Sequence, residues 1–179
     1  IGQEDDDIVT NVCDDPNDPN AFYVVGASRA DADLIPLVSK MRLDSLSPTW
    51  TQFFRPIHPE GSRSIAYGLG CQVSGDVLYV VGTIEDGAMM APGVESYGSD
   101  DIFATQVNVS DGSVNWIKQV GSSGKETLAH GGGLAVDSTG NAILYGSTTG
   151  SLFREKDGES FSDLFAFTLN KANGAHATP

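Results

Sequence analysis

Residues that commonly carry chemistry occur in this sequence, but they do not form a recognisable catalytic set. The three histidines, His58, His130 and His176, have no second histidine or cysteine within five positions, as a local zinc site would need. The glycine run 131–133 lacks the Lys-Ser/Thr ending of a phosphate-binding loop, and no Gly-x-Ser-x-Gly elbow is present. We therefore expect solvated histidines, no resident cofactor and no enzymatic activity.

Two acidic clusters, at residues 5–7 and 14–20, contain the oxygen ligands that calcium prefers. Neither cluster has the alternating acidic positions and the closing Glu of a calcium-binding loop. The sequence therefore assigns no metal site, with a structural calcium ion as the alternative that these clusters leave open.

The net charge is strongly negative, because 10 Lys and Arg stand against 24 Asp and Glu, giving −14. Such a charge repels phosphate backbones and anionic headgroups, so we expect no nucleic-acid partner. No apolar run approaches the roughly 20 residues of a membrane helix, so we expect no membrane insertion by this segment. We interpret the excess of acidic residues as surface charge that keeps the protein soluble, with specific cation binding as the alternative.

A repeated pattern organises the chain. Three apolar segments end at Gly26, Gly82 and Gly146, which are 56 and 64 residues apart. Self-similarity at this period is typical of β-propellers and solenoids. Around each copy the same elements return: a hairpin such as 133–141, an alternating strand such as 102–109, a tight turn and a last strand. The sequence therefore predicts an all-β fold of four-stranded antiparallel blades.

The repeat also predicts how the chain is divided. We expect an acidic N-terminal segment with the first inner strand (1–20), the rest of blade one (21–64), blade two (65–129) and a partial blade three (130–179). The count is eleven strands, because the third copy stops before its last strand and the expected Trp. Trp50 and Trp116 hold equivalent places on the last strand, and we interpret them as packing residues between blades rather than as ligand platforms.

The two cysteines occupy matching positions in consecutive repeats. Cys13 lies 13 residues before Gly26, and Cys71 lies 11 residues before Gly82, so both fall on a first strand. First strands converge near a propeller axis. In an oxidising compartment the two cysteines can form a disulfide between neighbouring blades if their Cα atoms lie within about 7 Å, with two buried free thiols as the alternative.

The sequence of residues 136–148, 101–105 and 111–116 resembles the SBBP family of β-propeller repeats. The shared pattern is Asp-x-x-Gly-Asn, an apolar strand ending in Gly, Asp-x-Phe, and Gly-x-x-x-Trp. The likeness extends from about residue 8 to 175, and the first copy departs from it at Pro36-Leu37 and Ser47-Pro48. Residues 111–116 are also similar to the Trp-docking repeat of quinoprotein propellers, without a cofactor ligand. The SBBP resemblance implies a secreted or surface propeller blade and transfers no catalytic residue.

The longer loops are the candidate binding site. In an antiparallel blade, the loop after the second strand and the connection to the next blade emerge at the same end. Loops 83–100 and 147–162 and connections 55–64 and 121–130 should therefore share one face, and loops on a rigid scaffold often carry binding. We expect ligand or partner contacts there, with folding back onto the loop as the alternative, from Glu85, Asp86, Met89, Met90, Tyr97, Phe153, Arg154 and Asp157.

Three blades leave unpaired ends, so we expect further blades of a parent protein, or another subunit, as partners. The expected function is a non-catalytic binding or structural module, extracellular or on the cell surface, that presents its loops to a protein or glycan. Asn108-Val-Ser matches the glycosylation acceptor pattern and supports that compartment. Two alternatives stay open: an accessory domain of a secreted hydrolase or quinoprotein, and a filament- or surface-assembly protein.

Overall fold

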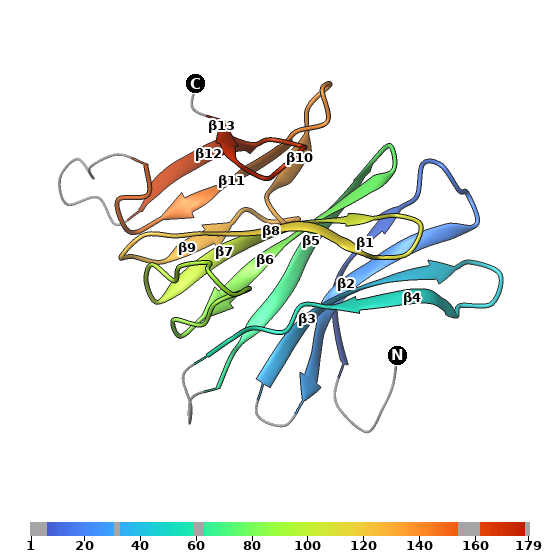
Figure 1. Cartoon of the computed structure of the whole chain (residues 1–179), viewed down its shortest axis with the longest axis horizontal. Helices are drawn as coiled ribbons and strands as arrows, with labels where there is room; N and C mark the ends of the chain where they lie inside the picture. Colours follow the sequence, from blue (N-terminus) through green and yellow to red (C-terminus); the bar gives the residue numbers. More distant parts are fainter. Residues whose placement is uncertain (1–6, 31–32, 59–62, 154–161, 178–179) are drawn as a thin grey trace.

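The computed structural model describes residues 7–30, 33–58, 63–153 and 162–177, which fold into three antiparallel β-sheets (Figure 1). The first sheet has the order β1-β2-β3-β4 and the second β5-β6-β7-β8; in the third, β11 lies between β12 and the pair β9 and β10, and β13 follows β12. The bounds are β1 Asp7–Asp14, β2 Ala21–Ala30, β3 Asp33–Arg42, β4 Pro48–Phe53, β5 Ala66–Ser74, β6 Val77–Glu85, β7 Asp100–Asn108, β8 Val114–Val120, β9 Glu126–Leu128, β10 Leu134–Val136, β11 Ala142–Thr148, β12 Asp163–Leu169 and β13 His176–Ala177.

The all-β prediction is confirmed, and the sheets are blade-like units that follow one another in chain order. Each sheet is built from consecutive strands, because β-branched and aromatic runs are separated by short turns rich in Gly, Asp and Asn. Within the described residues, no helix is long and apolar enough to cross a membrane.

The third sheet corrects the expected count of eleven strands: the described part of the chain contains thirteen. Its first strand is split into β9 and β10, and a two-residue β13 pairs with β12 where no fourth strand was expected. The split falls at Ala129–Gly133, where three consecutive glycines have positive φ and the chain leaves the sheet. Tyr145 spans the gap, donating from its N–H to Gly133 and accepting from the N–H of Ala129. Because β9 begins at Glu126, the third sheet starts ahead of residue 130.

Alternation along the strands of the second sheet sends side chains toward the first sheet on one face and toward the third sheet on the other. Tyr23 and Val25 of the first sheet pack with Val80 of the second in one buried cluster. Val81 of the second sheet packs with Leu144 of the third in another. The central sheet is therefore buried on both faces, and the two clusters hold the three sheets face to face.

The tryptophans join neighbouring sheets, which confirms their interpretation as packing residues. Trp50 donates from Nε1 to the carbonyl of Val109 over 3.2 Å, and its ring lies on Gly112 in the last turn of the second sheet. Trp116 makes the same contact one sheet further on, with the carbonyl of Lys171 at 3.1 Å and with Gly174. Both joints are thus built from one indole and one glycine.

The glycines that mark the repeat are required by close packing. At Gly26, Gly82 and Gly146, a Cβ would collide with a carbonyl oxygen of the neighbouring strand. At Gly82 and Gly146 it would also meet the ring of the aromatic residue on the next strand. The position accepts no side chain, and this explains why the same residue ends all three apolar segments.

The first strands of sheets one and two lie side by side. Cys13 of β1 and Cys71 of β5 form a disulfide with their Cα atoms 6.1 Å apart. Nearby, Asn11 donates from Nδ2 to the carbonyl of Leu69 over 3.1 Å, and Thr10 bonds the carbonyl of Gly68. A covalent bond and side-chain hydrogen bonds therefore fix the inner edge of this joint.

We predict that Gly112→Ala lowers the free energy of unfolding more than Gly75→Ala. Both glycines have φ near +70°, at 75° and 64°, so both variants carry the same backbone strain. Only at Gly112 would the new Cβ meet an indole, 2.7 Å from Trp50, whereas Gly75 has no atom within 4 Å. Urea unfolding should show an additional loss of about 1–3 kcal/mol for Gly112→Ala. Equal losses would contradict the indole–glycine joint.

We predict that removing the disulfide with a Cys13→Ser/Cys71→Ser double variant lowers the free energy of unfolding by about 2–4 kcal/mol, because the bond closes a long loop in the unfolded chain. The bond spans 58 residues. Urea unfolding of both proteins under non-reducing conditions measures the loss. Under reductant the two curves should coincide, and a persistent difference would assign the effect to the substitutions themselves.

Candidate functional site

The loop between β6 and β7 is tied to the connection that leaves the first sheet. Ile57 and Met89 exchange two backbone hydrogen bonds, of 2.6 and 2.8 Å, and so form a short antiparallel bridge. On the other side, Gly98 lies against the carbonyl of Ser122, in the connection between sheets two and three. The described loops and connections of neighbouring repeats therefore share one face.

A buried pair of polar side chains holds this loop in place. Gln119 of β8 donates from Nε2 to Asp101 over 2.7 Å and to the carbonyl of Ala88 over 3.0 Å. Its Oε1 accepts from the N–H of Met90, and Asp101 also accepts from the N–H of Tyr97. Both side chains belong to the sheet, so the loop backbone is fixed by groups that cannot move independently.

The predicted apolar contact residues of this loop differ in how far they are exposed. Met90 is only 3% exposed and belongs to the cluster between sheets one and two, so it is not available to a partner. It folds inward because the loop covers the open end of that core. Met89 is partly buried, and its backbone forms the bridge to Ile57. Tyr97 remains 46% exposed on the loop.

Phe153 is half-exposed but already has aromatic neighbours. Its ring stacks on His176 with centroids 4.7 Å apart and meets Phe167 edge-on at 4.9 Å. The other two predicted residues of this loop, Arg154 and Asp157, lie outside the described residues. Phe153 therefore packs on the third sheet rather than beside Tyr97.

Acidic side chains gather where β6 ends and β7 begins. Glu85 pairs across the strands with Asp100, Asp100 forms an ion pair with Lys125, and Asp86 is exposed at the start of the loop with a φ of 60°. Burial and the neighbouring Asp100 charge raise the pKa of Glu85. The Asp100 carboxylate likewise raises the pKa of Lys125. The rim formed by these residues is thus acidic, and Lys125 lies beside it.

A carboxylate of the acidic segment 14–20 is already bonded to other side chains of the protein. Asp15 is buried and accepts hydrogen bonds from Lys40 and from the hydroxyl of Tyr23, each at 2.9 Å. Burial alone would raise the pKa of Asp15, but these bonds and one from Asn17 hold it below its ordinary value. Among the described residues, no three His, Cys, Asp or Glu side chains are grouped as a metal site.

The glycosylation candidate Asn108 lies at the end of β7 and is half-buried. Its Oδ1 accepts hydrogen bonds from the backbone and the hydroxyl of Ser110, at 2.9 and 2.8 Å. These bonds shape the turn into β8, and glycosylation at Asn108 stays a prediction.

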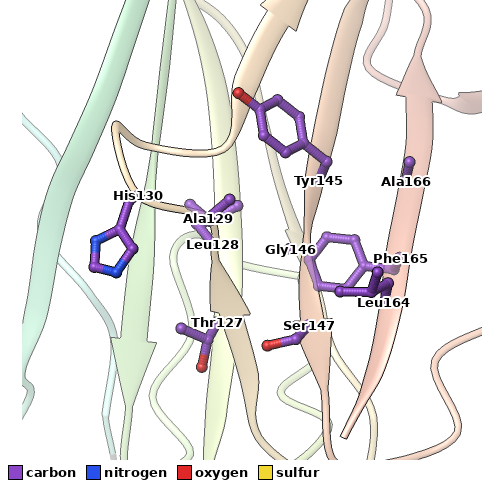
Figure 2. A pocket seen from close by; sticks show the side chains of 10 residues that line it. All are labelled: Thr127, Leu128, Ala129, His130, Tyr145, Gly146, Ser147, Leu164, Phe165 and Ala166. Atoms are coloured by element: carbon purple, nitrogen blue, oxygen red, sulfur yellow. The ribbon is translucent and has the colours of Figure 1, made fainter.

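A groove on the outer face of the third sheet was not predicted from the sequence. It has a volume of about 720 Å³ and lies where β9, β11 and β12 face away from the second sheet (Figure 2). Among the described residues its lining contains no Asp, Glu, Lys or Arg; the lining residues are Thr127, Leu128, Ala129, His130, Tyr145, Gly146, Ser147, Leu164, Phe165 and Ala166. The sequence feature that pointed to this groove is Leu164, an apolar residue at the same place in the Asp-x-Phe pattern as Ile102.

No protein-family model and no curated protein matches the chain.

We predict that Glu85→Gln raises the free energy of unfolding at pH 7, by at most about 0.5 kcal/mol, because this charge is partly solvated. A carboxylate whose pKa is raised by folding destabilises the fold when it is ionised. The gain should shrink as the pH falls and disappear by about pH 3, where Glu85 is protonated in both states. Urea unfolding at pH 7 and pH 3 tests this, and a gain that persists at pH 3 would exclude the electrostatic cause.

Proposed function

We propose that this chain is a non-catalytic propeller segment that serves as a binding and structural module, presenting its loop face to a glycan or protein ligand. The observation that carries the proposal is Tyr97, a half-exposed aromatic ring on a loop whose backbone is fixed by Asp101 and Gln119. A rigid aromatic contact residue loses little conformational entropy on binding and therefore suits recognition.

The surroundings of Tyr97 favour particular partners. Burial and the carboxylate of Glu95 raise the pKa of its hydroxyl. Glu85 and Asp86 lie at the first end of the same loop. An aromatic face among carboxylates offers apolar contact together with hydrogen-bond acceptors, which suits the hydroxyl groups of a sugar or the cations of a basic protein surface.

The compartment in this proposal is extracellular or the cell surface. The disulfide between Cys13 and Cys71 supports it, because such bonds persist in oxidising environments. The resemblance of the repeats to the SBBP family supports the same compartment.

We predict that Tyr97→Ser raises the Kd for a glycan that the unmodified chain binds by about tenfold or more, because the ring supplies the main apolar contact. A glycan array identifies the ligand. Titration calorimetry then measures the Kd of that glycan for the unmodified chain and for Tyr97→Ser. Val114→Ser is the control, since Val114 is also exposed, at 43%, but lies on β8 beyond the last turn of the second sheet. An equal loss in both variants, or no glycan bound by the unmodified chain, would contradict the glycan ligand.

A further inference from the structure

A polar groove lies at the joint between the second and third sheets, on the side of the short turns. It has a volume of about 620 Å³. Both sheets contribute to its polar lining, which consists of Asp76, Gln106, Asn115, Asn170 and Lys171. The turn between β5 and β6, which holds Asp76, and the loop between β6 and β7 lie at opposite ends of the second sheet (Figure 1). The groove is therefore separate from the loop face.

The same place in the joint between the first and second sheets is filled by the protein itself. Lys40 holds the position of Gln106, because each pairs across the strands with the tryptophan of its own sheet. Its Nζ lies 2.9 Å from the carboxylate of Asp15, in the hairpin loop between β1 and β2. From the same loop, Asn17 donates from Nδ2 to the carbonyl of Gly75 over 2.8 Å. A hairpin loop of the first sheet thus spans this end of the joint.

The joint between the second and third sheets has a shorter hairpin. Residues 15–20 separate β1 from β2, whereas only residues 75 and 76 separate β5 from β6. Gln106 is also shorter than the lysine that it replaces. Its Nε2 donates to the hydroxyl of Tyr79 over 3.0 Å and to the carbonyl of Lys171 over 2.9 Å. A shorter loop and a shorter side chain thus leave the groove open.

Two amide side chains of the groove are each fixed by one hydrogen bond. Asn115 donates from Nδ2 to Oε1 of the buried Gln106 over 3.0 Å. Asn170 accepts at Oδ1 from the backbone N–H of Ala172 over 2.8 Å. Among the described residues, no group bonds Oδ1 of Asn115 or Nδ2 of Asn170. One acceptor and one donor are therefore held in place for a ligand, so ordering them on binding costs little entropy.

The charged groups of the groove are balanced. Nζ of Lys171 lies 4.0 Å from a carboxylate oxygen of Asp76, and both side chains are open to solvent, at 43% and 84% exposure. The two charges cancel within the groove, whereas the whole chain carries −14. The field of the protein therefore opposes an anionic ligand, and nothing in the groove offsets that field.

We propose that this groove binds a short neutral saccharide. Sugar hydroxyls both donate and accept hydrogen bonds, and the groove presents amide, carboxylate and ammonium groups that do the same. Its volume falls within the roughly 300–1,000 Å³ of small-ligand sites. The saccharide would contact the second sheet through Asn115 and Asp76 and the third through Asn170 and Lys171. This site is additional to the loop face of the proposed function and does not depend on it.

NMR titration of the whole ¹⁵N-labelled chain tests the proposal. The probes are neutral trisaccharides of glucose, galactose, mannose or N-acetylglucosamine, each added to about 10 mM in order to detect a Kd of about 1 mM. At least one of them should shift the side-chain amide signals of Asn115 and Asn170, and the shifts should saturate. A trisaccharide that contains glucuronic acid should bind more weakly, because it carries the same sign of charge as the protein.

Variants assign the binding to the groove. Asn115→Ala and Lys171→Met should each raise the Kd about fivefold, because each removes a hydrogen-bonding group. Lys171→Met keeps the backbone carbonyl that Trp116 contacts, so it leaves the joint between the sheets intact. Thr49→Ala is the matched control, since Thr49 precedes Trp50 as Asn115 precedes Trp116, and its Kd should be unchanged.

Three results would overturn the proposal: no shift of these amides with any neutral probe, an equal loss of affinity in Thr49→Ala, or tighter binding of the acidic trisaccharide. Shifts confined to the residues around Tyr97 would reject the groove and retain the proposed function. Shifts at Asn115 and Asn170 that persist in Tyr97→Ser would support the groove whether or not the loop face binds a glycan.

Discussion

The contact between a tryptophan and a turn glycine sets the arrangement of this protein. Each indole lies flat on a residue without a side chain and donates to a carbonyl of the same turn, so apolar packing and a directional hydrogen bond act together. The pair fixes where the outer strand of one sheet meets the next. The two buried clusters and the disulfide then hold the rest of each interface along the length that this contact defines.

The loop face depends on the same arrangement. Once the sheets are placed, the connection from the first sheet reaches the loop of the second, and Ile57 can bridge to Met89. Asp101 and Gln119, which belong to the sheet, then fix the loop backbone and leave Tyr97 exposed. A binding surface of this kind is rigid because its supports are strands rather than other loops.

In the described part of the chain, no other sheet covers the outer faces of the first and third sheets. Leu46 and Leu164 are among the most exposed large apolar residues described, and they lie on the first and third sheets. The second sheet, covered on both sides, keeps the equivalent positions as a glycine under an indole and a buried isoleucine. The exposed apolar surface is thus a consequence of the repeat, whose every unit is built to be covered by a neighbour.

The all-β fold, the repeat and the packing role of Trp50 and Trp116 were determined by the sequence, because they depend on local alternation, on turn residues and on patterns that recur along the chain. The burial of Met90, the engagement of Asp15 by Lys40 and the split first strand of the third sheet were decided only by the tertiary structure. Each depends on which distant residues meet: Met90 lies over a core from two sheets, and Asp15 lies beside a lysine 25 positions away. The groove beside Leu164 has the same origin, because Leu164 fits an ordinary strand pattern and is exposed only since no sheet of the described residues covers it.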